Sequence, residues 1–234
     1  MLLHSDSRVP PAHADPHVWL LRDGEPLPEW VSSHDALSDS EQARADSIRH
    51  PRAKAQFIRG RAVLRSALAL RLGCLPADVP LRISPDGKPF LDAAEIGAEL
   101  HFNMSHTDGF ALFALASRPI GVDIEAADPK RDCDGLVRRF FTPVEQTEYF
   151  GLAAHRRPAA FLRGWTCKEA LLKAIGSGVR DLQNCAVRMH PDGAPLVLSA
   201  PGSAEWALEA SEVEAGVAWA VACVGHAPHD WEMN

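Results

Sequence analysis

The feature that most constrains how this chain folds is an internal repeat, in which four short segments recur in the same order. The recurring pairs are residues 38–41 with 142–145, 57–60 with 161–164, 85–89 with 191–195, and 109–114 with 216–221. The first pair reads S/T-x-x-E, a capping box that predicts the start of a helix. The third pair is a Pro-Asp-Gly turn, and the fourth is an apolar strand. Because the offset stays between 104 and 107 residues, the sequence predicts two similar α+β halves.

The repeat also predicts the elements of each half: a first strand, a capped helix, a long helix, a hairpin and closing strands. The long helices are expected at residues 52–72 and 158–175, and Gly176 is placed to end the second one as a C-cap. Such a pseudo-dimer has a cleft between its halves, and the active site is expected in that cleft. The expected boundaries are a flexible tail at 1–16, a first half at 17–117 and a second half at 118–234.

Length and composition narrow the class of protein. The chain has 234 residues, of which 46% are hydrophobic and 24% charged, as in a typical globular protein. It carries 24 Lys and Arg against 31 Asp and Glu, a formal charge of −7, which disfavours wrapping of nucleic acid. The sequence shows no apolar stretch that would span a membrane and no secretion signal. Five scattered cysteines without a C-x-x-C motif indicate a reducing, cytoplasmic setting.

The second half differs from the first in its acidic residues. Its first strand places Asp123 and Glu125 on one face, where their charges repel unless a cation lies between them. On the long helix that follows, Trp165, Glu169 and Lys173 share one face at intervals of four residues. Three carboxylates suit Mg²⁺, which binds few protein carboxylates together with substrate phosphates. The plainer alternatives are a solvated edge strand and an ordinary Glu–Lys pair on a helix.

The first half differs from the second in its basic residues. Residues 42–88 contain ten Lys and Arg against three Asp and Glu, a local charge of +7. The ten are Arg44, Arg49, Arg52, Lys54, Arg59, Arg61, Arg65, Arg71, Arg82 and Lys88. A phosphate-binding surface that faces the acidic residues would explain them, and Lys88 stands where the repeat has Ala194. A solvated helix face is the plainer alternative for several of them, Arg52 included.

Residues 101–107 close the first half with a strand that places Asn103 and Ser105 on one face, next to His106. Asn, Ser and His side chains at a strand end offer donors and acceptors for phosphate oxygens and for an adenine or ribose edge. For His106 alone, a structural hydrogen bond is the plainer alternative. The sequence has no G-x-S-x-G, Walker or G-x-G-x-x-G motif, which leaves those enzyme classes without support.

Five segments, taken in order, resemble a known family. They are GKPFL at 87–91, HFNMSH at 101–106, IGVDIE at 120–125, RRFFTPVE at 138–145 and WTCKEALLKAIGSG at 165–178. This series is similar to that of an Sfp-type 4′-phosphopantetheinyl transferase of the holo-acyl-carrier-protein synthase superfamily. The resemblance covers residues 37–187. It implies a monomer built as a pseudo-dimer, with the active site between two similar halves.

The resemblance implies roles for individual residues. Asp123, Glu125 and Glu169 match the Mg²⁺ ligands of the family, and Lys173 matches a lysine near the pyrophosphate of coenzyme A. The residues expected to contact coenzyme A are Arg44, Arg82, Lys88, Asn103, Ser105, His106 and Lys173, with His106 and Arg44 near the 3′-phosphate. Some members have an arginine where this chain has Gln56. Arg59 and Arg61 are the candidates to replace it.

Glu145 has two interpretations. The resemblance makes it a candidate base that acts in catalysis together with Glu169 and Lys173. Its spacing from Thr142, however, is a capping box, and Glu41 occupies the same place in the first half, away from any acidic cluster. Glu169 or a metal-bound water is the alternative base.

The expected function is Mg²⁺-dependent transfer of the 4′-phosphopantetheine group of coenzyme A to a serine hydroxyl of an acyl or peptidyl carrier protein, with release of 3′,5′-ADP. The protein is expected to be a cytoplasmic monomer that serves fatty-acid, polyketide or nonribosomal-peptide synthesis and binds neither nucleic acid nor membranes. Residues 140–150 are a candidate surface for the carrier, although Phe140 and Phe141 are also typical of a core. Two rivals are a Mg²⁺-dependent phosphohydrolase of a nucleotide-like pyrophosphate and a non-catalytic coenzyme A binding protein.

Overall fold

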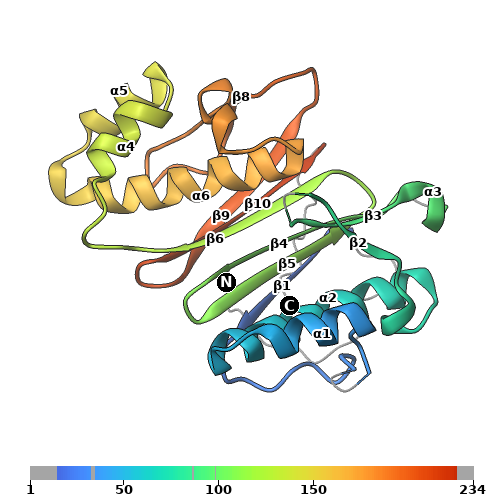
Figure 1. The fold of residues 1–234 in the computed structure, drawn as a ribbon. Coiled ribbons are helices and arrows are strands. Elements are labelled where there is room, and N and C mark those ends of the chain that lie inside the picture. The colour runs from blue at the N-terminus through green and yellow to red at the C-terminus, as the bar shows by residue number, and fades with distance from the viewer. Residues whose placement is uncertain (1–14, 33–34, 86, 98, 226–234) are drawn as a thin grey trace.

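The fold combines helices with antiparallel strands, and helices flank the strands on two sides (Figure 1). This computed structural model describes residues 15–32, 35–85, 87–97 and 99–225, so most of the expected tail at 1–16 lies outside it. The elements in chain order are β1 (His17–Arg22), α1 (Asp39–Ser47), α2 (Pro51–Leu72), η1 (Pro76–Asp78), β2 (Leu81–Ile83), β3 (Pro89–Leu91), α3 (Ala93–Ile96), β4 (His101–Thr107), β5 (Phe110–Ala116), β6 (Ile120–Ala126), α4 (Cys133–Phe140), α5 (Pro143–Gly151), η2 (Ala154–Arg156), α6 (Arg157–Ile175), η3 (Val179–Asn184), β7 (Ala186–Val187), β8 (Val197–Ser199), β9 (Trp206–Glu214) and β10 (Val217–Val224).

The helices begin and end where local sequence signals predict. Capping boxes at Ser38 and Thr142 start α1 and α5, as expected from their S/T-x-x-E spacing. The long helices α2 and α6 match the expected ranges to within one residue. Gly176 ends α6 in the left-handed conformation with φ 80°, which glycine adopts without steric cost. In the described ranges, every helix is too short or too polar to cross a membrane.

The strands form two antiparallel three-stranded sheets and two short ribbons. The sheets have the orders β1-β5-β4 and β6-β10-β9, and the ribbons pair β2 with β3 and β7 with β8. The Pro-Asp-Gly segments lie between the two strands of each ribbon, as the turn pattern predicts. The mixed helix and strand class expected from the sequence is therefore confirmed.

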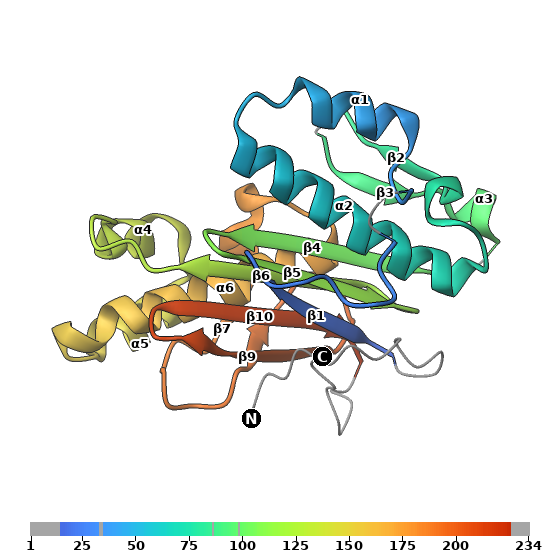
Figure 2. The same cartoon turned by 90° about the horizontal axis from the view of Figure 1, so that it is seen from below.

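Three hydrophobic cores arrange these elements in layers. Helix α2 packs on one face of the first sheet, where Leu68 joins Phe113 in the core. The opposite face packs against the second sheet, so that Leu112 and Val122 share one core. Helix α6 covers the outer face of the second sheet, and Leu171 lies in the core on that side. Figure 2 shows α1 and α2 on one side of the strands. The order of layers is therefore helix, sheet, sheet, helix.

Candidate active site

The acidic strand β6 has one face on the core shared by the two sheets and the other toward helix α6. Val122 and Ile124 point into the shared core, so Asp123 and Glu125 point the other way. Asp123 is only 3% exposed, whereas the Glu125 side chain is 28% exposed. The structure thus places both carboxylates on one face, as the alternation predicts. A solvated edge position is excluded for Asp123.

Helix α6 lies unusually close to β6 because residue 121 is a glycine. A Cβ atom on Gly121 would lie 2.1 Å from the carbonyl oxygen of Ala170 and 2.4 Å from the backbone nitrogen of Ala174. Any side chain at this position would push the helix away from the strand. The glycine therefore sets the separation that lets Lys173, on the same helix, reach the acids of the strand.

Lys173 connects the two sheets. Its Nζ donates to Asp123 Oδ1 at 2.7 Å and to the carbonyl of Val122 at 3.2 Å, both on β6. It also donates to Ser105 Oγ on β4 at 3.1 Å. Ser105 Oγ in turn donates to Asp123 Oδ1 at 2.7 Å. The predicted site residues Ser105, Asp123 and Lys173 therefore meet at one point.

The acid cluster, which we define as Asp123, Glu125 and Glu169, has three carboxylates for two neighbouring cations, Lys173 and Arg131. Burial and the charge of Asp123 raise the pKa of Glu169 to about 7, and Lys173 opposes this shift. Burial and the charge of Asp123 also raise the pKa of Glu125, although Arg131 Nη2 lies 3.7 Å from its carboxylate. The three carboxylates thus interact electrostatically, and a cation among them would relieve the repulsion.

The side chains of the acid cluster are of the type that binds a metal ion, but they are not already arranged as a metal site. Within the described ranges, no group of three or more His, Cys, Asp or Glu side chains is arranged to hold a metal. Asp123 Oδ2, however, is buried and has no hydrogen-bond partner in the part of the chain that is described. A buried oxygen without a partner costs free energy, and carboxylate oxygens are the ligands that Mg²⁺ prefers. The residues present therefore suit Mg²⁺.

Glu145 lies fully buried between α5, α6 and β7. Its Oε2 accepts the backbone N–H and the hydroxyl of Thr142 at 2.7 and 2.8 Å and pairs with Nζ of Lys168 at 2.6 Å. Its Oε1 accepts the N–H of Val187 at 2.9 Å. Both carboxylate oxygens are therefore occupied by core partners, and the capping box expected from the sequence is present.

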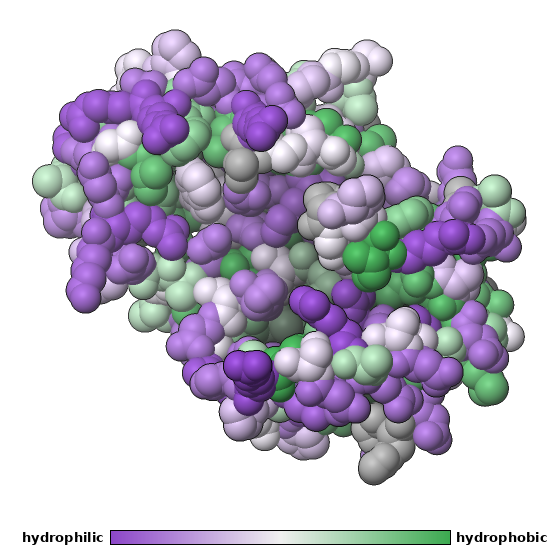
Figure 3. All heavy atoms as spheres, in the orientation of Figure 1, coloured by the Kyte–Doolittle hydropathy of each residue, from purple (hydrophilic) through white to green (hydrophobic). Residues whose placement is uncertain are grey.

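The residues expected to contact coenzyme A are only partly gathered at this site. Asn103 and Ser105 are buried on the face of β4 that meets β6, whereas His106 is exposed. Lys88 is exposed and lines a cavity of about 230 Å³ together with Asn103 and Lys173. Figure 3 shows a largely hydrophilic face around a central hollow.

Two expected contacts lie away from these residues. Arg44 is exposed on α1, and Arg82 is exposed on β2. Glu95 forms an ion pair with Arg82 and raises the pKa of its guanidinium group. Neither arginine lines the cavity of Lys88 and Lys173. Arg82 shares the ribbon of β2 and β3 with Lys88, but neither Arg44 nor Arg82 lines the cavities of Lys88 or His106.

His106 lines a second cavity, of about 440 Å³, together with His50, Arg52, Gln56 and Asp108. Arg52 lies one helical turn before Gln56 on α2 and forms an ion pair with Asp108. In the sequence, a solvated helix face is the plainer alternative for Arg52, and its side chain is 55% exposed. Its spacing of four residues from Gln56 is the signal that would have placed it beside His106.

The two arginines considered as replacements for Gln56 have other partners. Nη2 of Arg59 donates to the carbonyl of Glu25 at 2.7 Å. The Arg61 side chain is 12% exposed, and its Nε lies 3.6 Å from the carboxylate of Glu41. Both line an adjoining, mostly apolar cavity of about 320 Å³, which shares Gln56 and His106 with the cavity of Arg52. Gln56 Nε2 donates to Asp23 Oδ2 at 2.8 Å.

The family profile and the sequence relatives that match this chain belong to the same family. The sequence profile of the 4′-phosphopantetheinyl transferase superfamily matches residues 119–224, which include the acid cluster and Lys173. The 4′-phosphopantetheinyl transferase HetI of Nostoc sp. is 34% identical over 193 residues, or 82% of this chain and 80% of HetI. The 4′-phosphopantetheinyl transferase Sfp of Bacillus subtilis is 25% identical over 191 residues, or 81% of this chain and 83% of Sfp.

The likeness to solved structures is weaker. A holo-(acyl-carrier-protein) synthase from Bacillus anthracis is 24% identical and aligns with 47% of this chain and 96% of that chain, at a TM-score of 0.39. The assignment therefore depends on the sequence relatives. Since HetI matches over most of both chains and the family profile covers the acid cluster, this chain belongs to the 4′-phosphopantetheinyl transferase superfamily.

Proposed function

We propose that this protein transfers the 4′-phosphopantetheine group of coenzyme A to a serine hydroxyl of an acyl or peptidyl carrier protein and releases 3′,5′-ADP. The observation that carries the proposal is the contact of Lys173 with both Ser105 and Asp123. This contact places a cation between the strand with the expected coenzyme A residues and the strand with the acids. A pyrophosphate needs both positive charge and a metal site, and the two meet here. Family membership supports the same activity.

The active site lies in a cleft between two similar halves, residues 17–117 and 118–234. The two sheets support this division, because in each the first strand is at one edge, the last strand is central and the strand before it is at the other edge. Each half also has a short helix with a capping box, followed by a long helix. The halves meet where β4 lies beside β6, and the acid cluster is on that border.

Asp123, Glu125 and Glu169 would hold Mg²⁺. The support is the buried Oδ2 of Asp123, which has no hydrogen-bond partner among the described residues, and the raised pKa values of the two glutamates. When bound, Mg²⁺ would supply positive charge for the pyrophosphate oxygens of coenzyme A. Lys173 would bind those oxygens from the side of α6, since its Nζ already lies at the junction of the two strands.

Glu169 is the open carboxylate that would take the proton of the carrier serine. A cation in the cluster would lower its raised pKa and leave it ionised, ready to accept a proton. The serine oxygen then forms a bond to the β-phosphorus. The bond from that phosphorus to the bridging oxygen breaks, and 3′,5′-ADP leaves with the electron pair. We assign Glu145 to packing α5 on α6, because its two oxygens are occupied in the core.

The 3′-phosphate of coenzyme A would occupy the cavity that His106 and Arg52 line. Arg52 then supplies the charge that is missing at Gln56. In the structure, Arg52 Nη2 contacts Asp108 and lies 3.3 Å from Asp23 Oδ2, so a phosphate would compete with two carboxylates for it. Lys88, which lines a cavity with Lys173, would contact the coenzyme at the opposite end of β4.

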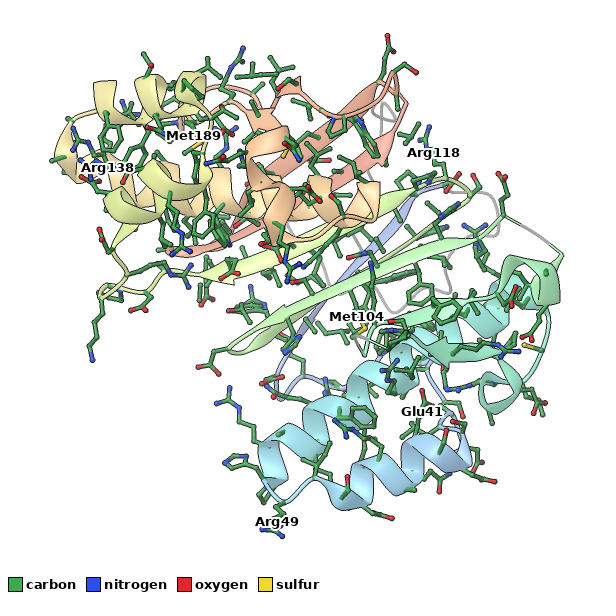
Figure 4. All side chains as sticks on the ribbon, turned by 45° about the horizontal axis from the view of Figure 1, so that its top comes forward. Glu41, Arg49, Met104, Arg118, Arg138 and Met189 are labelled. Atoms are coloured by element: carbon green, nitrogen blue, oxygen red, sulfur yellow. The ribbon has the colours of Figure 1, made fainter. Side chains whose placement is uncertain are left out.

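The acceptor would be an apo carrier protein, and the enzyme would act as a cytoplasmic monomer. The cytoplasmic setting is supported by the five cysteines, which are all free thiols. Residues 140–150 remain the proposed contact for the carrier, and we extend this surface to α4. Phe141 is 1% exposed and belongs to the core, so the contact would use exposed residues such as Val144 and Arg138 instead. Arg138 lies on α4 at the outer end of the molecule (Figure 4).

The test is to incubate the protein with coenzyme A, Mg²⁺ and an apo carrier protein, and then to weigh the carrier. We expect the carrier to gain the mass of phosphopantetheine. Glu169→Gln should abolish the gain, and the control Glu212→Gln, an exposed residue of β9, should leave it unchanged. Consumption of coenzyme A without a change in carrier mass would indicate the phosphohydrolase instead. Binding of coenzyme A without turnover would indicate the non-catalytic binding protein.

A further inference from the structure

The border between β4 and β6 is held by side chains rather than by a backbone ladder. The two strands are neighbouring edges of different sheets, as both ribbon views show (Figures 1 and 2). Three alternate residues of β4, Asn103, Ser105 and Thr107, share one face of the strand. Met104, between them, points toward α2 (Figure 4), and its methyl group would lie 3.9 Å from a Cβ on Gly60. The three polar side chains therefore face β6, and we call this border the seam.

Two of the three side chains bind the backbone of β6 directly. Asn103 Oδ1 accepts the N–H of Val122 at 3.3 Å, and Thr107 Oγ1 accepts the N–H of Ala126 at 3.2 Å. The third, Ser105, donates to the carboxylate of Asp123 at 2.7 Å. These two N–H groups of β6 would bind the backbone of a neighbouring strand in a continuous sheet. At the seam, side-chain oxygens of β4 accept their hydrogen bonds instead.

The positions of these contacts along β6 are specific. Val122 directly precedes Asp123, and Ala126 directly follows Glu125, so the two N–H groups bracket the acidic pair. A strand held at both ends of a four-residue interval cannot slide or tilt over that interval without losing a hydrogen bond. The seam therefore fixes where the two carboxylates lie relative to Ser105.

We propose that Asn103 and Thr107 are positioning residues, which hold the acidic pair of β6 at a fixed distance from the coenzyme A side of the site. The inference rests on the proposed function. It gives Asn103 a role other than the expected contact with coenzyme A, since its side chain is buried and its Oδ1 is occupied by Val122. It adds Thr107, which the sequence pattern did not single out although it continues the alternation of Asn103 and Ser105.

A purely structural seam and a positioning seam predict different results. If the seam only stabilises the fold, its loss lowers the melting temperature and leaves the turnover of the folded protein unchanged. If it positions the acids, its loss lowers kcat together with the protection of the two bracketing amides of β6. The KM for coenzyme A does not separate the two cases, because Asn103 and Thr107 also line the cavities proposed for the coenzyme. Residues that orient metal ligands typically change metal affinity or activity by about tenfold to a hundredfold when they are removed.

The test uses Thr107→Val, which removes the acceptor and keeps the shape of the side chain, and Thr107→Ser, which keeps the acceptor. We expect Thr107→Val to lower kcat by about tenfold. Its Ala126 amide should exchange hydrogen faster in metal-free buffer. Thr107→Ser should restore both values. Ser211→Ala, which removes a hydroxyl at an exposed position on β9, is the control and should change neither.

Asn103→Ala gives a second variant, for which the Val122 amide should lose protection in the same way. Faster amide exchange with an unchanged kcat, in either variant, would overturn the positioning role. So would a lower kcat with unchanged amide exchange, because the seam would then not be the cause. An inactive wild-type protein would instead refute the proposed function, and that result appears before any variant is compared.

Discussion

At the scale of single residues, a half-buried carboxylate that stays ionised weakens the fold unless a cation compensates it. Glu169 is such a group, because burial and the charge of Asp123 raise its pKa from 4.5 to about 7. In the unfolded chain the same carboxyl loses its proton near its ordinary value. The stabilising contribution of the protonated form is therefore fully present below pH 4.5 and is lost as the pH rises through about 7.

Because the stability contributed by protonated Glu169 is lost at high pH, we expect Glu169→Gln to stabilise the metal-free protein at pH 8. The amide carries no charge, so the variant should melt several degrees above the wild type in EDTA, and the difference should disappear near pH 5. Melting curves at the two pH values measure it, with Glu212→Gln as the exposed control. Equal melting temperatures at pH 8 would contradict the account of the acid cluster as a site of excess negative charge.

Arg52 tests the 3′-phosphate site at the same scale. It lines the cavity of His106, whereas Arg49 is exposed and lies on the outer side of the two helices (Figure 4). Arg52→Ala should raise the KM for coenzyme A by about two- to fivefold, the effect expected for one exposed charged contact. It should leave the KM for coenzyme A without the 3′-phosphate unchanged. Arg49→Ala should affect neither substrate, and an equal effect of Arg52→Ala on both substrates would refute the assignment.

At the scale of elements, each long helix carries a buried base that pairs with the capping-box glutamate of the short helix before it. Arg65 of α2 pairs with Glu41, and Lys168 of α6 pairs with Glu145. Breaking a buried ion pair leaves a buried charge uncompensated, which typically costs about 3–5 kcal/mol. These pairs therefore fix the angle at which α1 meets α2 and α5 meets α6. Figure 4 shows Glu41 between α1 and α2.

The two pairs also explain why the repeat is visible in the sequence only in part. With an offset of 104 residues, the position that corresponds to Lys168 is Leu64, and Arg65 is one residue further along. Arginine and lysine differ in length and in the number of donors, so each reaches its glutamate from a different position of the helix. The ion pair is therefore present in both halves, although the basic residue differs in type and in its position on the helix.

The structural features that the sequence predicted well are those that depend on residues close together in the chain. A capping box, a C-cap glycine and the alternation of a strand each depend on a few neighbouring residues, so the bounds of α6 and the shared face of Asp123 and Glu125 followed from the sequence. The roles proposed for Thr107 and Arg52 did not. They depend on which strand edges meet and on which residues line a cavity, and no periodicity within one segment encodes either.

At the scale of the whole molecule, the net charge of −7 is an average over two unlike regions. The basic residues of 42–88 lie mainly on α1, α2 and the ribbon of β2 and β3, and the acid cluster lies on β6 and α6. Lys173 and Ser105 join the two regions at the seam. A substrate with a phosphate at one end and a pyrophosphate at the other matches this distribution better than a uniformly charged polymer would.

The two regions also share a core, and this predicts how the molecule unfolds. Leu112 of β5 and Val122 of β6 belong to one buried cluster between the sheets, so neither sheet can lose its partner without exposing apolar surface. Urea should therefore unfold residues 17–117 and 118–234 in one transition. Hydrogen exchange of peptides from both ranges measures this transition. Leu112→Ala should cost about 3–5 kcal/mol and lower the midpoint equally in both ranges. Leu70→Ala, the same change at a side chain 48% exposed, should shift it little. A fall in the midpoint confined to residues 17–117 would mean that the shared core does not couple the two sheets.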